Sequence, residues 1–271
     1  MKNGKTIAVR AVSIVLAAAA LVGGIPALTA TSARIEDGAA PLVPQPLSAA
    51  QILKKIDDNR VTDNKIIVSE MIIHGRRESR SVKSKSWIEG VTRSFTEYLE
   101  PARDKGTKML KLANELWTYT PSTDRTIKIS GNLLRQSVMG SDLSYEDMME
   151  DPLLSHLYEA KMAGEDTSGN RPCWILQLSA KKEDVAYYTR TVWVDRERFV
   201  ILKEDMYARS GKLLKTLDVK SVRWIEERWV QDKIVYRDVM KTGDGTEFNI
   251  ESIEFNAAIP DYVFSKASLR R

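Results

Sequence analysis

Residues 116–149 read LWTYTPSTDRTIKISGNLLRQSVMGSDLSYEDMM, and this stretch decides the fold. It begins with two short segments, 116–120 and 125–129, in which apolar or aromatic side chains alternate with Thr or Lys. A Pro-Ser-Thr-Asp turn joins them, so a hairpin is predicted. The alternation then stops, and a segment rich in methionine and acidic residues follows. We expect an aromatic hairpin joined to a segment that can move over the surface of a sheet.

Strand patterns dominate the rest of the chain. Ser48 fits a helix N-cap, with Ile52, Leu53 and Ile56 at helical spacing and an end near Asn59. Further strands are predicted at 65–74, 80–89, 93–99, 107–113, 158–166, 173–179, 188–195, 199–207, 212–229, 233–241 and 246–255. Consecutive strands without helical crossovers exclude a βαβ fold. The pattern predicts a mainly β protein with a few helices, whose antiparallel meander curls into a barrel or a strongly curved open sheet.

Several predicted strands are apolar on both faces. In 65–74, Ile66, Val68 and Ile72 alternate with other apolar residues. A sheet with one face in water would show a cleaner alternation of apolar and polar residues. Each face is therefore expected to be covered, one by a helix and the other by a lining that holds a ligand. The pattern leaves open which face is concave.

The N-terminus has the pattern of a targeting segment. Lys2, Lys5 and Arg10 precede an apolar run at 11–22 that is too short to span a bilayer. We expect a cleavable signal peptide at 1–33, a flexible tether at 34–46, a single domain at 47–271 and a periplasmic protein, with an uncleaved anchor as the alternative. The single cysteine, Cys173, lies far from the predicted cleavage site, so no lipid-bearing cysteine and no intramolecular disulfide are expected.

The charge of the chain gives little support to a nucleic-acid partner. The formal net charge is +4 at pH 7, and the predicted signal peptide carries Lys2, Lys5 and Arg10. Without these three residues the balance is about +1. The remaining charges are interspersed, whereas nucleic-acid binding favours a basic stripe.

The acidic residues within 142–151 form the cluster that could serve the most chemical roles. Asp142, Glu146, Asp147, Glu150 and Asp151 could supply an acid and a base, bind calcium, or stabilise the start of a helix. The capping-box-like spacing at 144–147 favours the helix. Neither histidine belongs to a metal-binding or catalytic motif, and the nucleotide-binding motifs are absent from the sequence. We therefore expect no enzyme activity, no cofactor and no metal, and a hydrolase that uses Asp142 and Glu146 is the less favoured alternative.

Aromatic and methionine residues gather in the first half of the predicted domain. Methionine suits volumes that change shape, such as a site for variable acyl chains. The predicted cavity wall comprises Trp87, Phe95, Met109, Trp117 and Tyr119, and the predicted lid comprises Met139, Leu143, Tyr145 and Met148. The alternative is that these side chains form an ordinary core.

Three stretches resemble the outer-membrane lipoprotein-sorting proteins, the LolA-like carriers. They are the hairpin at 116–129, the run MGSDLSYED at 139–147 and the closing run at 253–265. The resemblance covers about 47–269 and implies a half-closed antiparallel β-barrel with helices on or over its concave side. It also implies a monomer that carries lipoprotein or other lipid cargo from an inner-membrane transporter to an outer-membrane acceptor. Related domains sense lipids, so a regulatory module acting on an inner-membrane signalling partner is the alternative.

Overall fold

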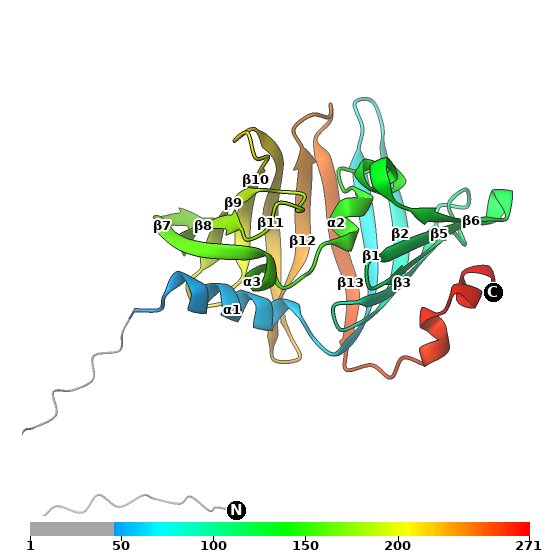
Figure 1. The fold of residues 1–271 in the computed structure, drawn as a ribbon, viewed down its shortest axis with the longest axis horizontal. Helices are drawn as coiled ribbons and strands as arrows, with labels where there is room; N and C mark the ends of the chain where they lie inside the picture. Colours follow the sequence, from blue (N-terminus) through cyan, green and yellow to red (C-terminus); the bar gives the residue numbers. More distant parts are fainter. Residues whose placement is uncertain (1–45) are drawn as a thin grey trace, which may run out of the picture. The chain divides into compact units, whose positions relative to one another are not determined.

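One antiparallel sheet dominates the computed structural model, which describes residues 46–271 (Figure 1). Within these residues the sheet has 13 strands in the order β6-β5-β4-β3-β2-β1-β13-β12-β11-β10-β9-β8-β7. The strands are β1 (Asn64–His74), β2 (Ser79–Glu89), β3 (Arg93–Glu100), β4 (Lys108–Leu112), β5 (Glu115–Thr120), β6 (Arg125–Ile129), β7 (Tyr158–Ser168), β8 (Arg171–Ala180), β9 (Thr189–Asp195), β10 (Ile201–Tyr207), β11 (Leu213–Ile225), β12 (Arg228–Asp238) and β13 (Gly245–Phe255). The predicted fold class, a mainly β half-closed barrel, is confirmed. The predicted signal peptide and nearly all of the predicted tether lie outside the described residues.

In chain order, the first strands run from the centre of the sheet to one edge, and the later strands run from the other edge back to the centre. Strands β1 to β6 form a meander that runs to one edge, and β7 to β13 form a second meander that starts at the other edge. The last strand returns to pair with the first, with Ile67 opposite Ile253. The two edge strands, β6 and β7, are therefore consecutive in the sequence although they are farthest apart in the sheet. Residues 130–157, the crossing segment, must span the open face to connect them (Figure 1).

Short helices occupy the crossing segment and the C-terminus. The α-helices are α1 (Ala49–Arg60), α2 (Tyr145–Met149) and α3 (Leu154–Leu157), and the 3-10 turns are η1 (Pro121–Thr123), η2 (Gly131–Arg135), η3 (Val138–Gly140), η4 (Asp261–Phe264) and η5 (Lys266–Arg270). None of the helices in the described part of the chain has the length and apolarity that a membrane span requires.

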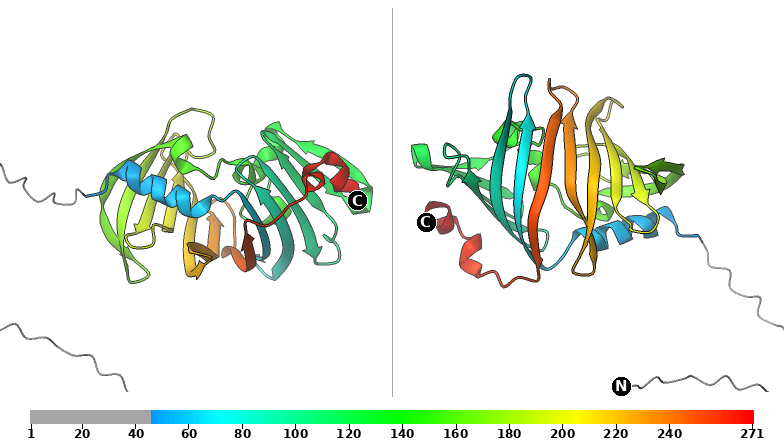
Figure 2. Two further views of the ribbon diagram at one scale, coloured as in Figure 1. Left: turned by 90° about the horizontal axis from the view of Figure 1, so that it is seen from below. Right: turned by 180° about the vertical axis from the view of Figure 1, so that it is seen from behind.

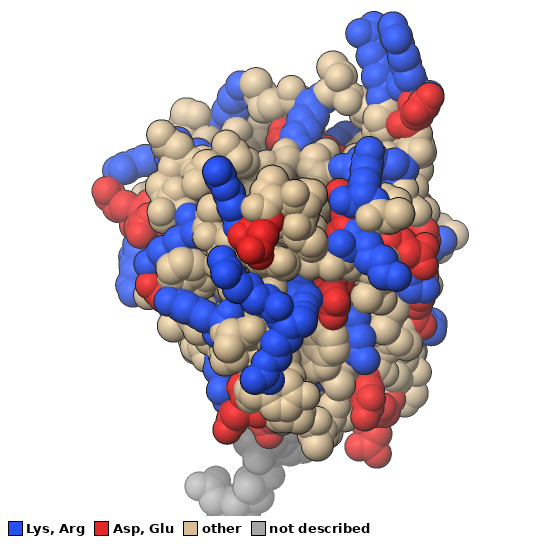
Figure 3. Space-filling view, turned by 90° about the vertical axis from the view of Figure 1, so that its right-hand side faces the viewer, with Lys and Arg blue, Asp and Glu red and all other residues tan. Residues whose placement is uncertain are grey.

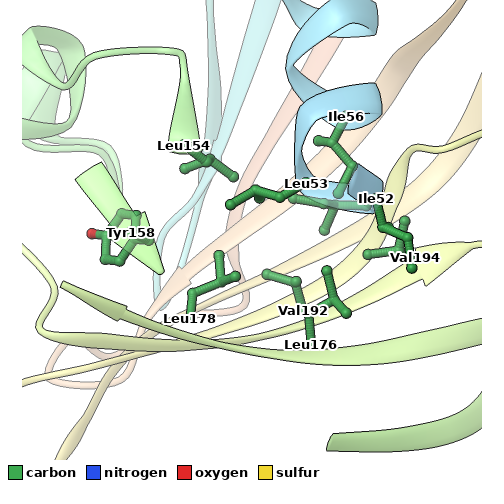
Figure 4. Close-up of a cluster of buried hydrophobic side chains, with 10 residues drawn as sticks. Ile52, Leu53, Ile56, Leu154, Tyr158, Leu176, Leu178, Val192 and Val194 are labelled. Atoms are coloured by element: carbon green, nitrogen blue, oxygen red, sulfur yellow. The ribbon is translucent and has the colours of Figure 1, made fainter. Parts of the chain in front are cut away.

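Helix α1 covers one half of the concave face. Ser48 forms a capping box with Gln51, as the N-cap pattern predicts, and the helix ends at Arg60. Ile52, Leu53 and Ile56 are buried against residues of β8, β9 and β10, where Leu176 and Val192 are fully buried (Figure 4). Full burial of each such aliphatic side chain contributes about 1.5–3 kcal/mol. The helix is thus fixed to the sheet by its apolar face.

The crossing segment covers the other half of the concave face. Its residues Val138, Met139 and Leu143 pack against Met71 of β1 and Met109 of β4. Figure 1 shows α2 in front of the central strands and α3 beside α1. Asp57 of α1 accepts hydrogen bonds from the backbone N–H groups of Leu154 (2.8 Å) and Ser155 (3.0 Å), so it caps α3 and joins the two covers.

The C-terminal segment, residues 256–271, covers the convex face. Phe264 and Leu269 are buried against Phe95 of β3 and Leu110 of β4. The two further views in Figure 2 show this segment beside β3 to β5, at the end of the sheet away from α1. The convex face is therefore covered at β3 to β5, whereas Ile66, Val68 and Ile72 of β1 are only partly buried.

Two predicted strands, 212–229 and 233–241, are wrong in extent, because β12 runs from Arg228 to Asp238. The prediction at 212–229 runs through a turn, because β11 ends at Ile225 and β12 begins at Arg228. Glu226 and Glu227 form this turn with φ values of 45° and 62°. Hairpin turns with positive φ usually contain Asn or Gly, and glutamate rarely adopts this conformation. The sequence therefore gives no signal for this turn.

Candidate functional site

Three adjoining cavities lie between the concave face and its covers. The apolar cavity has a volume of 220 Å³ and is lined by Ile56, Asn59, Arg60, Lys65, Ile67, Pro152, Phe199, Val200, Ile201, Trp229, Val230, Gln231, Ile234, Ile250, Ile253 and Phe255. The polar cavity has a volume of 250 Å³ and shares Lys65 and Pro152 with it. The ionic cavity has a volume of 230 Å³ and shares Arg60 and Ile234 with the apolar cavity. The crossing segment thus divides one groove into three parts.

The apolar cavity lies where β1, β12 and β13 pass beneath the C-terminal end of α1. Its walls are mostly aliphatic and aromatic, with Ile67 and Ile253 directly opposite one another in the sheet. Ile56 closes it from α1 and Pro152 from the crossing segment. A cavity with this lining favours hydrocarbon, because each buried methylene group contributes about 0.8 kcal/mol.

The polar cavity follows a row of cross-strand neighbours on the same face. Lys65 of β1 pairs with Ile88, Ile88 with Ser94, and Ser94 with Lys111 of β4. Neighbours in such a row point to the same side of the sheet, and all four residues line this cavity. Ser86 and Thr96 lie in the next row and bond to each other at 2.8 Å. Two lysines and three hydroxyls therefore face a region of the concave side that is apolar elsewhere.

Buried ion pairs surround the ionic cavity. Asp147 of α2 pairs with Lys215 of β11 and accepts a hydrogen bond from the Tyr187 hydroxyl at 2.6 Å. Arg190 of β9, which is 3% exposed, pairs with Glu204 of β10 at 2.7 Å and with Glu150 of the crossing segment. The crossing segment is thus held to the sheet by charges that water scarcely reaches, a setting in which loss of one partner is costly.

The environment shifts the pKa values of these carboxyl groups in opposite directions. Burial acts to raise the pKa of Asp147, but the Lys215 ammonium, the Ser144 N–H and the Tyr187 hydroxyl outweigh it and hold that pKa below its usual value. Burial raises the pKa of Glu150, and Arg190 only partly offsets that effect. Asp147 therefore stays ionised to a lower pH than an ordinary aspartate, whereas Glu150 becomes protonated at a higher pH than an ordinary glutamate.

Lys65 differs from these paired groups. Its ammonium donates to the Arg60 carbonyl at 3.0 Å. Burial, with the nearby Arg60 and Arg228 charges, lowers the pKa of Lys65 to about 8. Within residues 46–271, no carboxylate lies within ion-pair distance of Arg60, Lys65, Lys111 or Arg228. The groove therefore carries an excess of positive charge.

The sequence-predicted cavity residues lie on two different faces. Phe95, Leu110 and Trp117 are cross-strand neighbours on the convex face, where Trp87 and Tyr119 join them beneath the C-terminal segment. Met109 instead faces the crossing segment on the concave side. None of the five lines the three cavities described above. The register between strands, which no single strand pattern contains, separates them.

Figure 3 shows the side of the molecule that ends in β6 and the C-terminal segment, where Lys and Arg side chains lie among acidic ones. Two lysines lie over the ring of Trp117. The Lys266 ammonium lies 3.9 Å from the centre of the Trp117 ring, and the Lys128 ammonium lies 5.6 Å from it. Trp117 is thus part of a covered surface layer.

The predicted lid residues lie within the crossing segment, at different depths. Met139, Leu143 and Tyr145 pack on the concave core, whereas Met148 is 39% exposed and borders the polar and ionic cavities. The structure thus brings Met139, Leu143 and Tyr145 together with Met109. Movement of this segment stays a prediction.

The acidic cluster is divided among separate structural contacts. Asp142 accepts hydrogen bonds from the Thr246 hydroxyl (2.6 Å) and the Asp238 N–H (2.9 Å). Asp147 forms the capping box with Ser144, as the spacing predicts. Asp151 contacts His156 at 2.9 Å. The contacts of Asp142 join the crossing segment to β12 and β13, and the other two contacts lie within the segment.

Sequence reasoning missed the groove cations. Lys65 and Lys111 stand at the start or end of short strand patterns, where lysine is typical of a solvated position. The available signal is the two-residue period of β1. Lys65 is an even number of positions from the buried Met71 and Ile73, so these side chains point to the same face of the sheet. That spacing places Lys65 on the concave face once the core residues are known.

Comparisons with known proteins agree with this architecture. A protein-family model described as "Uncharacterized protein" matches residues 90–271. The comparison with curated proteins gave no match.

Three solved structures share the fold across 82% of this chain. A DUF1329 family protein from Desulfovibrio piger has a TM-score of 0.74 at 20% identity over 97% of its chain. A protein domain described as outer-membrane lipoprotein-sorting, from Vibrio parahaemolyticus, has a TM-score of 0.73 at 23% identity over 98% of its chain. A LolA superfamily protein from Nitrosomonas europaea has a TM-score of 0.69 at 21% identity over its whole chain. The chain therefore belongs to the family that the matching model describes, and its fold is that of the LolA-like proteins.

Proposed function

We propose that the protein is a periplasmic carrier that binds lipoprotein acyl chains or other lipids in the apolar cavity and moves them toward the outer membrane. The observation that carries the proposal is this 220 Å³ cavity on the concave face, lined by aliphatic side chains and closed by α1 and the crossing segment. Acyl chains are too insoluble to cross an aqueous compartment unaided, and each methylene group buried there contributes about 0.8 kcal/mol.

The location and partners follow from the same proposal. The basic and apolar pattern at 1–22 supports export, and the lipoprotein-sorting description of one structural relative supports this class of cargo. A monomer would receive cargo from an inner-membrane transporter and release it to an outer-membrane acceptor. Binding and release require no covalent chemistry.

The placement of the acidic cluster favours binding over hydrolysis. Asp142 is 8% exposed and is held by Thr246 and Asp238, whereas Glu146 lines a further cavity with Asn114 and Asp184. A general acid and a general base must both reach one substrate bond. The partners of Asp142 support a structural role for this carboxylate.

The direct test is to purify the protein from bacterial envelopes, extract it with organic solvent and identify bound lipid by mass spectrometry. Uptake of a fluorescent lipopeptide by the delipidated protein measures binding. Ile67→Phe and Ile253→Phe fill the cavity and are expected to reduce uptake at least tenfold. Ile127→Phe is the matched control, because Ile127 is 47% exposed on edge strand β6. Protein that carries no lipid and takes up no lipopeptide would exclude a carrier.

A further inference from the structure

The groove combines an apolar cavity with a cluster of cations, and this combination defines the chemistry of a ligand. Arg60 ends α1, Lys65 lies near the start of β1, and Arg228 starts β12. Arg60 and Lys65 both line the apolar cavity, and Lys65 also lines the polar cavity. The cluster therefore lies at the junction between a space for hydrocarbon and a space for polar groups.

Within residues 46–271 no carboxylate forms an ion pair with these cations, although Glu150 acts on Arg60 at longer range, and Glu150 and Asp151 act on Lys111. Within the described residues, the ion pairs of the groove join Asp147 to Lys215 and Glu150 to Arg190, so the carboxylates of the polar cavity are already paired. Lys111 donates only to main-chain oxygen, with the Met149 carbonyl at 3.1 Å. Burying neighbouring charges of the same sign costs free energy unless an anion compensates them.

The polar cavity also supplies hydrogen-bond donors suited to phosphate oxygens. Ser94 lies between Lys65 and Lys111 in the cross-strand row, with Ile88 completing it, and Thr96 and Ser86 lie beside that row. Lys65 and Lys111 are three strands apart, which separates their backbones by about 14 Å. The Lys65 ammonium is held by the Arg60 carbonyl and the Lys111 ammonium by the Met149 carbonyl, and Ser94 lies on the sheet between the two strands.

We propose that Arg60, Lys65 and Lys111 bind the phosphate-bearing headgroup of an anionic phospholipid in the polar cavity, while its acyl chain occupies the apolar cavity. This inference rests on the proposed carrier function and specifies its cargo by charge. Lys65 contacts the phosphate at the junction of the cavities, Arg60 contacts it from the end of α1, and Lys111 contacts the distal part of the headgroup. Arg228 adds to the positive potential from β12.

The lowered pKa of Lys65 agrees with this role. A lysine whose charge is disfavoured by burial and by neighbouring cations gains most from a phosphate that arrives with the ligand. Phosphate binding is expected to raise the pKa of Lys65 back toward its ordinary value. The ligand would then neutralise the excess positive charge of the groove as well as fill its volume.

The test compares two amphiphiles with the same fluorescent acyl chain, phosphatidylglycerol and uncharged diacylglycerol, binding to the delipidated full-length protein. Wild type is expected to bind the phosphatidylglycerol at least tenfold more tightly, because a charge-assisted hydrogen bond contributes about that factor or more. Lys65→Met and Arg60→Gln are expected to remove this preference, weakening phosphatidylglycerol binding at least tenfold more than diacylglycerol binding. Lys65→Arg is expected to retain it. Lys54→Met is the matched control, since the Lys54 side chain is 74% exposed on α1.

The outcomes separate the two proposals. Equal binding of both amphiphiles by wild type, or loss of both in Lys65→Met, would overturn the headgroup site and leave the carrier function standing. Absence of binding by either amphiphile would overturn the carrier function as well. Displacement of the phosphatidylglycerol by glycerol phosphate at a similar concentration would show a site for small free anions, which contradicts a lipid headgroup site. Circular dichroism spectra that match wild type establish that each variant is folded.

Discussion

The carboxylate of Asp147 in α2 forms a buried ion pair with the ammonium of Lys215 in β11. The two residues are 68 positions apart in the sequence and meet only because the crossing segment lies over the concave face. The Asp147 side chain is 13% exposed and the Lys215 side chain 6% exposed, so the pair is shielded from water. It connects the cover of the groove directly to its wall.

Asp147→Asn is expected to lower the free energy of unfolding by about 3 kcal/mol at pH 7, because Lys215 is left buried without its partner. The double variant Asp147→Asn, Lys215→Met should recover most of that loss, and urea unfolding of the four proteins measures the coupling. The pKa of Asp147 in the folded protein lies below its unfolded value of about 3.9. The stability that this carboxylate contributes is therefore fully present above the unfolded pKa and disappears as the pH falls through the folded pKa. Wild type and Asp147→Asn should therefore converge below about pH 4. A constant difference down to pH 2 would contradict this role.

Lys65 should produce the opposite pH dependence. Its folded pKa of about 8 lies below that of an unfolded lysine, so the unfolded chain binds more protons between these values and stability rises with pH. Without ligand, wild type should gain about 1–2 kcal/mol between pH 8 and pH 10 relative to Lys65→Met, a figure reduced for partial solvent screening. Denaturant unfolding at several pH values measures it. Parallel curves for the two proteins would refute the shift.

Substitutions on the two faces should separate stability from binding. Trp117→Ala removes a convex-face contact with the C-terminal segment and should lower stability by about 3 kcal/mol without weakening lipid uptake. Ile67→Phe, on the concave face, should weaken uptake with a smaller effect on stability. Thermal unfolding and lipopeptide uptake of both variants give the comparison. Loss of uptake by a Trp117→Ala variant that remains folded would indicate that lipid binds at the convex aromatic face instead.

The predicted mobility of the crossing segment can be tested by a covalent bond. The side-chain oxygens of Asp142 and Thr246 lie 2.6 Å apart, so a cysteine pair at these positions is oxidised and disulfide formation is verified by thiol titration. The oxidised double variant should lose most lipid uptake, and reduction should restore it. The Asp142→Cys single variant, under the same oxidation, controls for loss of the Thr246 contact. Full uptake by the oxidised protein would show that the part of the crossing segment around Asp142 need not move.

Local patterns predicted the elements well because they depend on neighbouring residues. The Ser48 cap, the α1 stripe of Ile52 and Leu53, and the 125–129 strand all follow from spacing within a few positions. The turn at Glu226 was missed because its positive φ is imposed by the pairing of β11 with β12. The elements that local chemistry specifies were predicted, and the turn that pairing imposes was not.

The lining of the candidate cavities was harder to predict because it depends on strand register. Phe95 and Met109 belong to adjacent strands and are both large and apolar, yet Phe95 pairs with Leu110 and Met109 pairs with Thr96. This offset of one residue places them on opposite faces. Neither strand alone contains that information.

By itself the sequence determined a β meander interrupted once, an apolar composition on both strand faces and a capped helix start within the interruption. These properties come from side-chain periodicity and turn chemistry, which act over a few residues. Only the tertiary structure decided which face is concave and which cations meet there. The pairing of β1 with β13 brings Lys65 near Arg228, and strand register places Lys65 and Lys111 on one face. Those contacts join residues far apart in the chain, so their geometry exists only once the sheet has curved and the crossing segment has covered it.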